Sequence, residues 1–108
     1  MSKSTEIQVT RTDDGVIIIS LPAGALDEES LEATKHKIYP LVDGLGTSEM
    51  RVDLAHVTAL GSSALGMLLT LHRRAAQGGG HLALCGLAPN LQQLIRLIRL
   101  DTILDVRT

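Results

Sequence analysis

Two adjacent hydroxyl side chains, Ser62 and Ser63, lie where a predicted strand region gives way to a predicted helix. Gly61 allows the chain to bend just before them, and serine here is a good candidate for the helix N-cap. The free N–H groups and the dipole of a helix start favour negative charge, so the fold would tolerate a phosphate on Ser62. That phosphate would add about 1.5 to 2 negative charges, enough to break a packed apolar interface. A simpler interpretation stays open, in which Ser62 only caps the helix.

Catalysis by these serines is a weaker hypothesis. A serine hydrolase places its nucleophile in Gly-x-Ser-x-Gly, whereas the five-residue segment that starts at Gly61 ends in Leu65. Cys85 is expected to be a small packed side chain, and the histidines lack metal-ligand spacing with it or with one another. We therefore expect no enzyme activity, no metal and no cofactor. The four histidines are His36, His56, His72 and His81.

The predicted helix over residues 62–77 carries two apolar stripes at helical spacing. We expect the first stripe to face the sheet. The second either widens this buried face or forms a partly exposed apolar patch beside Ser62, which is what a switchable docking site needs. The first stripe consists of Leu65, Leu68, Leu69 and His72, and the second of Ala64, Met67 and Leu71.

Local patterns predict the strands that position this segment. Alternation indicates a half-buried strand over residues 5–10, and a β-branched run indicates a more buried strand over 16–21, joined to the first by a hairpin turn. Strands are also predicted over 49–54 and 81–86. The segment from His56 to Gly61 is predicted to be a turn region.

Three helices are predicted, the first starting after Asp27 and ending or kinking near Pro40. The second covers 62–77 and ends at the glycines 78–80, one of which we expect in the left-handed conformation. The third opens at Pro89 and runs to residue 100. The order β-β-α-β-α-β-α predicts an α/β domain with a four-stranded mixed sheet packed with helices. The buried stripes are predicted to hold Leu31, Thr34, Ile38 and Leu41 in the first helix, and Leu91, Leu94, Ile95 and Ile98 in the last.

Composition narrows the classes of function. At 108 residues, 44 % of them hydrophobic, the chain predicts one domain over residues 1–108, with 1–4 as a loose end. A net charge of −2 and a single aromatic residue give no reason to expect nucleic acid as a partner. One cysteine fits a reducing cytoplasm, and no apolar run reaches the length of a membrane span. The oligomeric state is left open.

Several short motifs occur in a specific order along the chain. They are Gly24, Leu26 and Asp27 after the second strand, Val52 to Leu54 with Val57, the run Leu60 to Gly66, Gly79 to Leu82 with Leu84, and Leu97 to Leu104. Together they resemble the STAS family, and specifically its anti-sigma factor antagonists. The run Leu60 to Gly66 resembles the signature Asp-Ser-Ser-Gly-Leu-Gly of that family. Each motif is weak alone, but their order and spacing are fairly specific for the fold.

The resemblance implies a STAS fold and a bacterial, cytoplasmic regulator of transcription. In that family the first serine of the pair, which falls on Ser62, accepts a phosphate from an anti-sigma factor that is a serine kinase. The unphosphorylated form binds the anti-sigma factor and frees the sigma factor, whereas the phosphorylated form lets go. Asp27 is equally well explained as a helix cap only. The expected partner contacts are Asp27, Gly61, Ser62, Ser63, Ala64 and Met67.

The sequence departs from the family pattern at four positions. Gly61 replaces the usual Asp before the serine pair, and Ala64 replaces the Gly after it. Arg99 occupies a position where Gly is usual, and Leu104 one where an aromatic residue is usual. The lost aspartate favours an alternative, a STAS subunit that never carries phosphate. Such a subunit would be a fixed interaction module, for example on a transport ATPase or in a larger signalling assembly.

Overall fold

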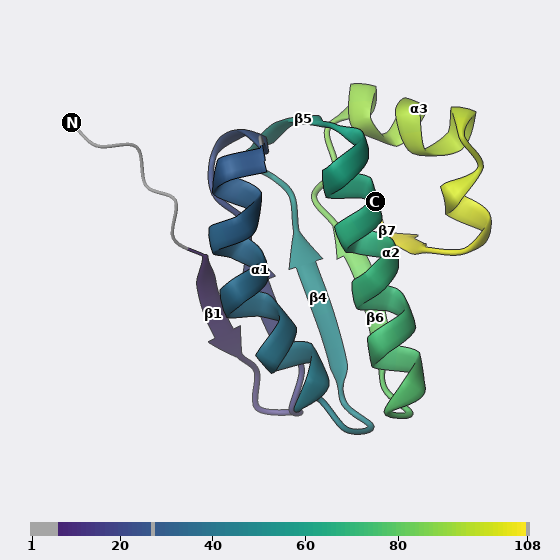
Figure 1. The fold of residues 1–108 in the computed structure, drawn as a ribbon. Coiled ribbons are helices and arrows are strands. Elements are labelled where there is room, and N and C mark those ends of the chain that lie inside the picture. The colour runs from purple at the N-terminus through teal and green to yellow at the C-terminus, as the bar shows by residue number, and fades with distance from the viewer. Residues whose placement is uncertain (1–6, 27, 108) are drawn as a thin grey trace.

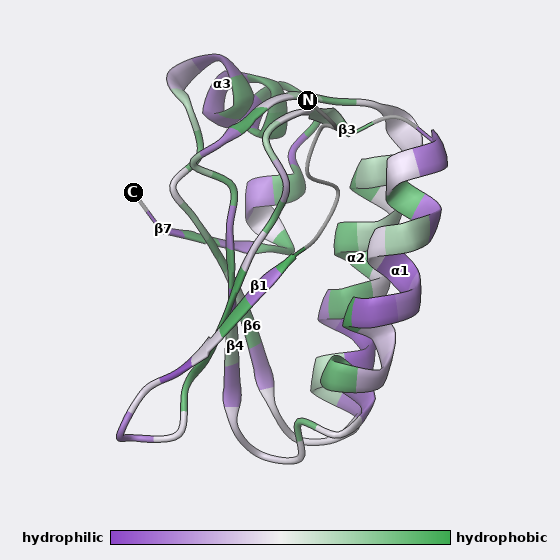
Figure 2. Ribbon diagram, turned by 90° about the vertical axis from the view of Figure 1, so that its left-hand side faces the viewer, coloured by the Kyte–Doolittle hydropathy of each residue, from purple (hydrophilic) through white to green (hydrophobic). Residues whose placement is uncertain are grey.

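The computed structural model of the chain describes residues 7–26 and 28–107. A five-stranded sheet with the order β1-β2-β4-β6-β7 carries two helices, α1 and α2, side by side on one face (Figures 1 and 2). The third helix, α3, lies at one end of the sheet (Figure 1). The strands of this sheet are β1 (Gln8–Arg11), β2 (Ile17–Ser20), β4 (Glu49–Asp53), β6 (His81–Cys85) and β7 (Asp105–Arg107), and the helices are α1 (Glu28–Asp43), α2 (Ser62–Gln77) and α3 (Pro89–Leu97).

The pairing within the sheet confirms the predicted mixed topology. β1 is antiparallel to β2, and the other neighbouring pairs are parallel. β2 is buried as predicted, and Ile19 has no exposed surface. The prediction of a half-buried first strand holds at Ile7, which packs partly buried against the core, and is wrong for β1 itself. All four residues of β1 are exposed, because β1 is the sheet edge and lies beside α1 rather than beneath it (Figure 1).

Three short strands were not predicted. β3 (Gly24–Leu26) and β5 (Val57–Leu60) form a separate two-stranded parallel sheet, so the predicted turn region from His56 to Gly61 is wrong. β7 adds a fifth strand beside β6 and corrects the predicted count of four. Strands of three or four residues are too short to show a period of two, and their partners are remote in sequence.

Helix α1 runs through Pro40 and ends at Asp43, so the predicted end near this proline is confirmed to within one turn. A proline removes one backbone hydrogen bond, here to the carbonyl of His36. Both His36 and Pro40 are exposed, so water can replace that bond. Ile38 and Val42 are buried on the opposite side and hold the helix on the core. Leu31, Thr34 and Ile38 are buried as predicted, with Val42 in place of the partly buried Leu41.

The predicted last helix is divided. α3 ends at Leu97, Arg99 adopts the left-handed conformation with φ 60°, and a short 3-10 helix, η1 (Leu100–Thr102), follows. Leu91 and Ile95 of the predicted stripe are buried, whereas Ile98 is 45 % exposed. At the end of α2, Gly79 has a positive φ, as expected for one of the three glycines. In the described part of the chain, no helix is long and apolar enough to cross a membrane.

Candidate docking site at the start of helix α2

The connection from β5 to α2 sets the position of the serine pair. β5 ends at Leu60, Gly61 has an extended backbone with φ −83° and ψ 177°, and α2 begins at Ser62. The N–H of Leu65 donates to the carbonyl of Gly61 at 3.0 Å, which makes Gly61 the N-cap. The prediction that Ser62 is the N-cap is therefore wrong by one residue. Because Gly61 has no side chain, no side-chain hydrogen bond caps this helix.

Ser62 and Ser63 are both exposed on the first turn of α2. Within residues 7–26 and 28–107, neither hydroxyl takes part in a hydrogen bond. No acidic residue occupies the first turn of α2, so the positive end of the helix dipole is not offset by its own side chains. The arrangement can accept an added anion at Ser62 without displacing an existing contact.

The residues beneath the serines belong to the core. Ala64 and Met67 have exposed fractions of 0 % and 1 %, so neither can touch a partner in this conformation. Their predicted role as contact residues is corrected accordingly. The exposed or partly exposed residues of this turn form what we call the α2 surface, which consists of Gly61, Ser62, Ser63, Leu65 and Gly66.

The second stripe of α2 widens the buried face, which is one of the two predicted alternatives, whereas the stripe predicted to face the sheet is fully buried only at Leu68. Ala64, Met67 and Leu71 are fully buried together with Leu68 and Ala75, because α1 packs against this side of the helix as well as the sheet. Leu65, Leu69 and His72 are only partly buried. The partly exposed apolar residues beside Ser62 are therefore Leu65 and Leu69, one helical turn apart.

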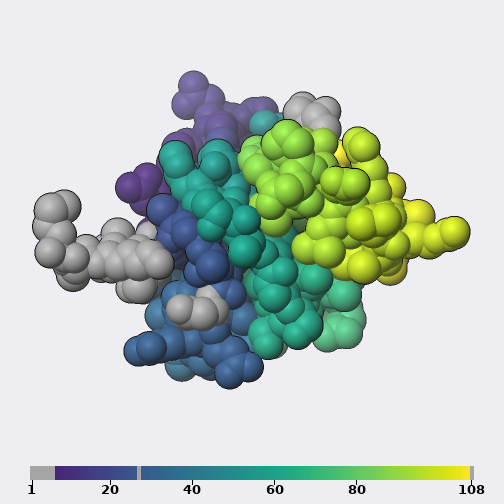
Figure 3. All heavy atoms as spheres, turned by 90° about the horizontal axis from the view of Figure 1, so that it is seen from above, coloured from purple at the N-terminus to yellow at the C-terminus, as the bar shows by residue number. Residues whose placement is uncertain are grey.

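Negative charge lies at the same end of the molecule. α1 and α2 both begin at the upper end of the sheet, and Glu28 and Glu29 are exposed in the first turn of α1 (Figure 1). Viewed from above, teal atoms of the β5–α2 connection lie between the blue atoms of α1 and the yellow-green atoms of α3 (Figure 3). Asp27, the remaining predicted contact, lies outside the described residues.

A second group of exposed residues at this end was missed from the sequence. Leu97, Ile98 and Ile103 are exposed by 74 %, 45 % and 52 % around the turn that follows α3. α3 contacts β5, which leads into α2. One signal was available, since the run from Leu94 to Leu100 has more aliphatic residues than one helix face can bury.

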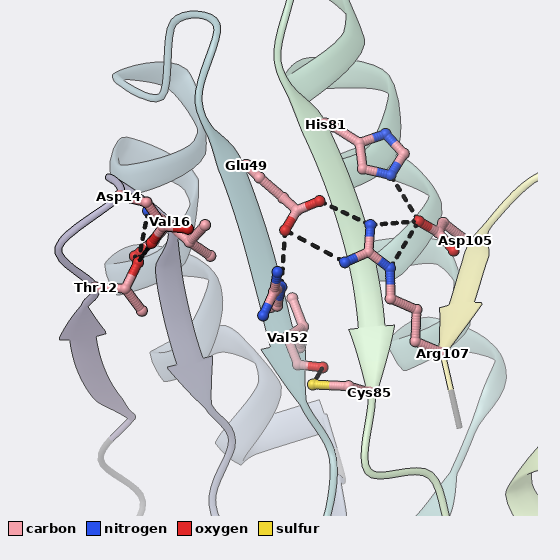
Figure 4. Close-up of polar contacts among 10 residues, drawn as sticks. Thr12, Asp14, Val16, Glu49, Val52, His81, Cys85, Asp105 and Arg107 are labelled. Carbon is pink, nitrogen blue, oxygen red and sulfur yellow. Dashed lines mark hydrogen bonds and ion pairs between the residues drawn. The ribbon is translucent and has the colours of Figure 1, made fainter.

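The face of the sheet opposite the helices carries a cluster of charged side chains (Figure 4). Arg107 Nη2 donates to Glu49 Oε1 at 2.7 Å and to Asp105 Oδ2 at 3.0 Å, and Arg51 Nε donates to Glu49 Oε2 at 2.7 Å. His81 Nε2 lies 2.7 Å from Asp105 Oδ2. These contacts join β4, β6 and β7 and lie on strands rather than at the α2 surface. We interpret the cluster as structural.

Cys85 lies near this cluster and is not set up as a nucleophile. Its Sγ donates to the carbonyl of Val52 at 3.7 Å, and burial, with a smaller effect from the Asp53 carboxylate, raises the pKa of the thiol. Among the described residues, no group of three or more His, Cys, Asp or Glu side chains is arranged to hold a metal ion. No histidine in the described part of the chain hydrogen-bonds to Ser62 or Ser63, so the nucleophile–base contact of a serine hydrolase is missing there.

The domain is of the α/β class and of the STAS type. The features that define this type are the mixed sheet, the helices on one face and the serine pair that opens the second helix. The chain belongs to the STAS family, because the family model described as "Mlab, STAS domain" matches residues 9–105. The resemblance inferred from the short motifs is confirmed, as is the fold class.

Solved structures agree with this fold. The protein TM1081 of Thermotoga maritima is 22 % identical with a TM-score of 0.79, covering 93 % of this chain and 84 % of its own. An anti-sigma factor antagonist from Mycobacterium paratuberculosis is 24 % identical with a TM-score of 0.76, covering 98 % and 89 %. The anti-sigma factor antagonist SpoIIAA of Bacillus, in its unphosphorylated form, is 18 % identical with a TM-score of 0.70, covering 95 % and 88 %. At these identities the likeness is one of fold.

Proposed function

We propose that this chain is an anti-sigma factor antagonist that binds an anti-sigma factor through the α2 surface, and that phosphorylation of Ser62 ends the binding. The observation that carries the proposal is the exposed hydroxyl of Ser62 on the first turn of α2, on a helix whose other side buries Ala64 and Met67. A modification at this point changes the surface without reaching the core. The chain acts by docking on a protein, in the cytoplasm, and not as a catalyst.

The physical basis is that a phosphate on Ser62 has a different effect on the stability of the free protein than on the stability of the complex. In the free protein, a phosphate on Ser62 meets the positive end of α2, which stabilises negative charge. In a complex, the same phosphate must leave water beside Leu65 and Leu69, both partly exposed aliphatic side chains. Desolvation of a doubly charged group against an apolar surface disfavours binding strongly. The switch therefore acts on association and spares folding.

The comparisons support the proposal at the level of the proteins they describe. SpoIIAA, to which this chain is similar in fold, has been solved in both an unphosphorylated and a phosphorylated form. The departure at Gly61 leaves the acceptor itself in place. For Ser62 as the acceptor, the position at the start of the second helix is the supporting feature.

The test compares Ser62→Asp with Ser62→Ala and with Ser48→Asp. Ser48 is an exposed serine just before β4, at the opposite end of the parallel strands, and serves as the matched control. The purified anti-sigma factors of the same genome are titrated by calorimetry. We expect Ser62→Asp to weaken binding by at least about tenfold, as a desolvated charge in an interface does, while Ser62→Ala and Ser48→Asp bind like the parent. Equal binding by all three variants would sink the proposal.

A second candidate function is a fixed STAS interaction subunit, for example of a transport ATPase. The specific observation that favours it is Gly61, which leaves the start of α2 without the acidic side chain of the family signature. This candidate predicts tight partner binding that Ser62→Asp does not change. It also predicts no phosphate transfer to Ser62 from an anti-sigma kinase, even in Gly61→Asp, which a phosphate-affinity gel would measure.

A further inference from the structure

The turn after α3 presents an apolar surface with two cationic side chains, and we call it the α3 patch. It consists of Leu97, Ile98 and Ile103, which are exposed, flanked by Arg96 and Arg99. Hydrogen bonds from Thr102 N to Arg99 O and from Ile103 N to Leu100 O fold the segment into one compact turn. Large aliphatic side chains are rarely exposed together in this way on a surface that only meets water.

The two arginines are not used by the fold. Both are exposed, and among the described residues neither lies within ion-pair distance of a carboxylate. In contrast, Arg74 pairs with Asp43, and Arg107 pairs with Glu49 and Asp105. The α3 patch therefore combines apolar area with two arginines that make no ion pair within the described residues, and Asp101, which lines a pocket with Arg96, offsets only part of their charge.

Arg99 adds an independent observation. It is the one non-glycine residue with a positive φ in the described part of the chain, at 60°. A side chain in this conformation destabilises the backbone, and glycine would relieve the strain. Because the Arg99 side chain makes no ion pair with a described residue to offset this strain, its presence here points to a role outside the fold.

We propose that the α3 patch is a docking surface for a protein partner that presents an apolar surface bordered by carboxylates. Arg99 and Arg96 pair with these carboxylates, and Leu97, Ile98 and Ile103 pack on the apolar part. Arginine is enriched among the energetically important residues of protein interfaces. We infer that this partner is the same protein that docks on the α2 surface, and in this respect the inference rests on the proposed function. The reason is that α3 and the start of α2 lie at one end of the molecule (Figure 1).

The first test is crosslinking in cells of the source organism, with a photoreactive amino acid at position 97 or 103. Position 62 reports the α2 surface. Position 9 is the control, because Val9 is also an exposed aliphatic residue, at 45 %, but lies on the edge strand β1. We expect the same protein to be captured from 62, 97 and 103, and not from 9. Crosslinking from 97 and 103 no stronger than from 9 would overturn the inference.

The second test measures the affinity of the captured protein, purified, for surface variants. Leu97→Ser and the double variant Arg96→Glu/Arg99→Glu are each expected to weaken binding by about tenfold or more. Val9→Ser and Arg73→Glu are the matched controls, because Arg73 is an exposed arginine on α2, and both should bind like the parent. The parental affinity should fall as salt is raised, and the double variant should lose that dependence.

The variant Arg99→Gly separates binding from folding. We expect its Tm to rise by about 2–5 °C, since strain is relieved, while its affinity falls. A purely structural role of Arg99 would leave the affinity unchanged and would contradict the inference. Sedimentation and vesicle flotation test the other possible occupants. Self-association of the parent that is lost in Leu97→Ser would assign the α3 patch to a second copy of the chain. Binding of the parent to anionic vesicles that is lost in the double variant would assign the patch to a lipid surface.

Failure of this inference and failure of the proposed function give different results. If Ser62→Asp weakens binding and the α3 patch variants do not, the α2 surface is the whole docking site. If the α3 patch variants weaken binding and Ser62→Asp does not, the patch is a docking surface but the phosphate switch is wrong.

Discussion

Gly86 lies directly against Asp53, so that a Cβ on Gly86 would be 2.5 Å from Asp53 Oδ1 and 3.1 Å from the backbone N of Ala55. Asp53 Oδ1 already accepts a hydrogen bond from that backbone N at 2.9 Å. Asp53 is the last residue of β4 and Gly86 directly follows β6, so this contact shapes the loops that lead from the sheet toward β5 and α3.

We expect Gly86→Ala to destabilise the fold by about 2–4 kcal/mol, the sum of overpacking and a positive φ of 74°. Gly15→Ala is the matched control, because Gly15 also has a positive φ but no described atom within 4 Å of its would-be Cβ. That control should lose only about 1 kcal/mol. Urea unfolding measures both, and equal losses would show that the Asp53 contact does not matter.

Burial of Met67 beneath the α2 surface predicts a stability effect rather than a binding effect. We expect Met67→Ala to cost about 2–5 kcal/mol in unfolding free energy, as for other buried methionines. Leu65→Ala, at a partly buried position of the same helix, should cost clearly less. Denaturant titration decides between them, and a loss for Met67→Ala no larger than that for Leu65→Ala would contradict the assigned burial.

The N-cap of α2 can accept the aspartate that the family signature has. Gly61 has φ −83°, which any residue adopts, and no atom of residues 7–26 or 28–107 lies within 4 Å of its would-be Cβ. An Asp side chain can accept a hydrogen bond from a free N–H of the first turn, so we expect Gly61→Asp to stabilise the fold by about 0.3–0.5 kcal/mol. Gly61→Asn separates the cap from the charge. A Tm for Gly61→Asp below that of the parent would refute this account.

The charged cluster on the open face of the sheet predicts a response to acid. The hydrogen bond from Arg107 lowers the pKa of Glu49, and that from His81, followed by that from Arg107, lowers the pKa of Asp105. A carboxyl with a lowered pKa stabilises the fold above its unfolded pKa, about 4, and this contribution is lost as the pH falls through the folded value.

We therefore expect the Tm of the parent to fall more steeply below about pH 4 than that of Glu49→Gln/Asp105→Asn. At pH 7 the variant should be the less stable of the two, and the difference should shrink with acid. Thermal unfolding across this range is the measurement. Curves that stay parallel down to low pH would mean that these contacts contribute nothing to stability.

Much of the fold was predictable because the signals were local. The prediction of a helix over 62–77 agrees with α2 at both ends, since glycines at 61 and 78 bound an amphipathic run. β2, β4 and β6 were found through β-branched or alternating residues. β3, β5 and β7 were missed because pairing with a remote strand, and not local composition, defines a three- or four-residue strand.

The site was predicted less completely. The exposure of Ser62 at the start of a helix agrees with expectation, but Leu65, Leu69 and His72 of the stripe predicted to face the sheet are only partly buried. Both stripes have helical spacing, and only the packing of α1 beside α2 decides between them. Small residues on the buried side, Ala64 and Ala75, fit the close approach of a second helix. The exposed turn after α3 depended on the backbone of Arg99, which no propensity indicates.

The bare side of the sheet has a consequence for life in a crowded cell. Largely parallel sheets are usually covered by helices on both faces, and an exposed apolar sheet face would be a site of association. Here the ion pairs that Glu49 makes with Arg51 and Arg107 keep that surface hydrated and disfavour the stacking of another sheet. The molecule can therefore stay dispersed while leaving its helical end free to be recognised.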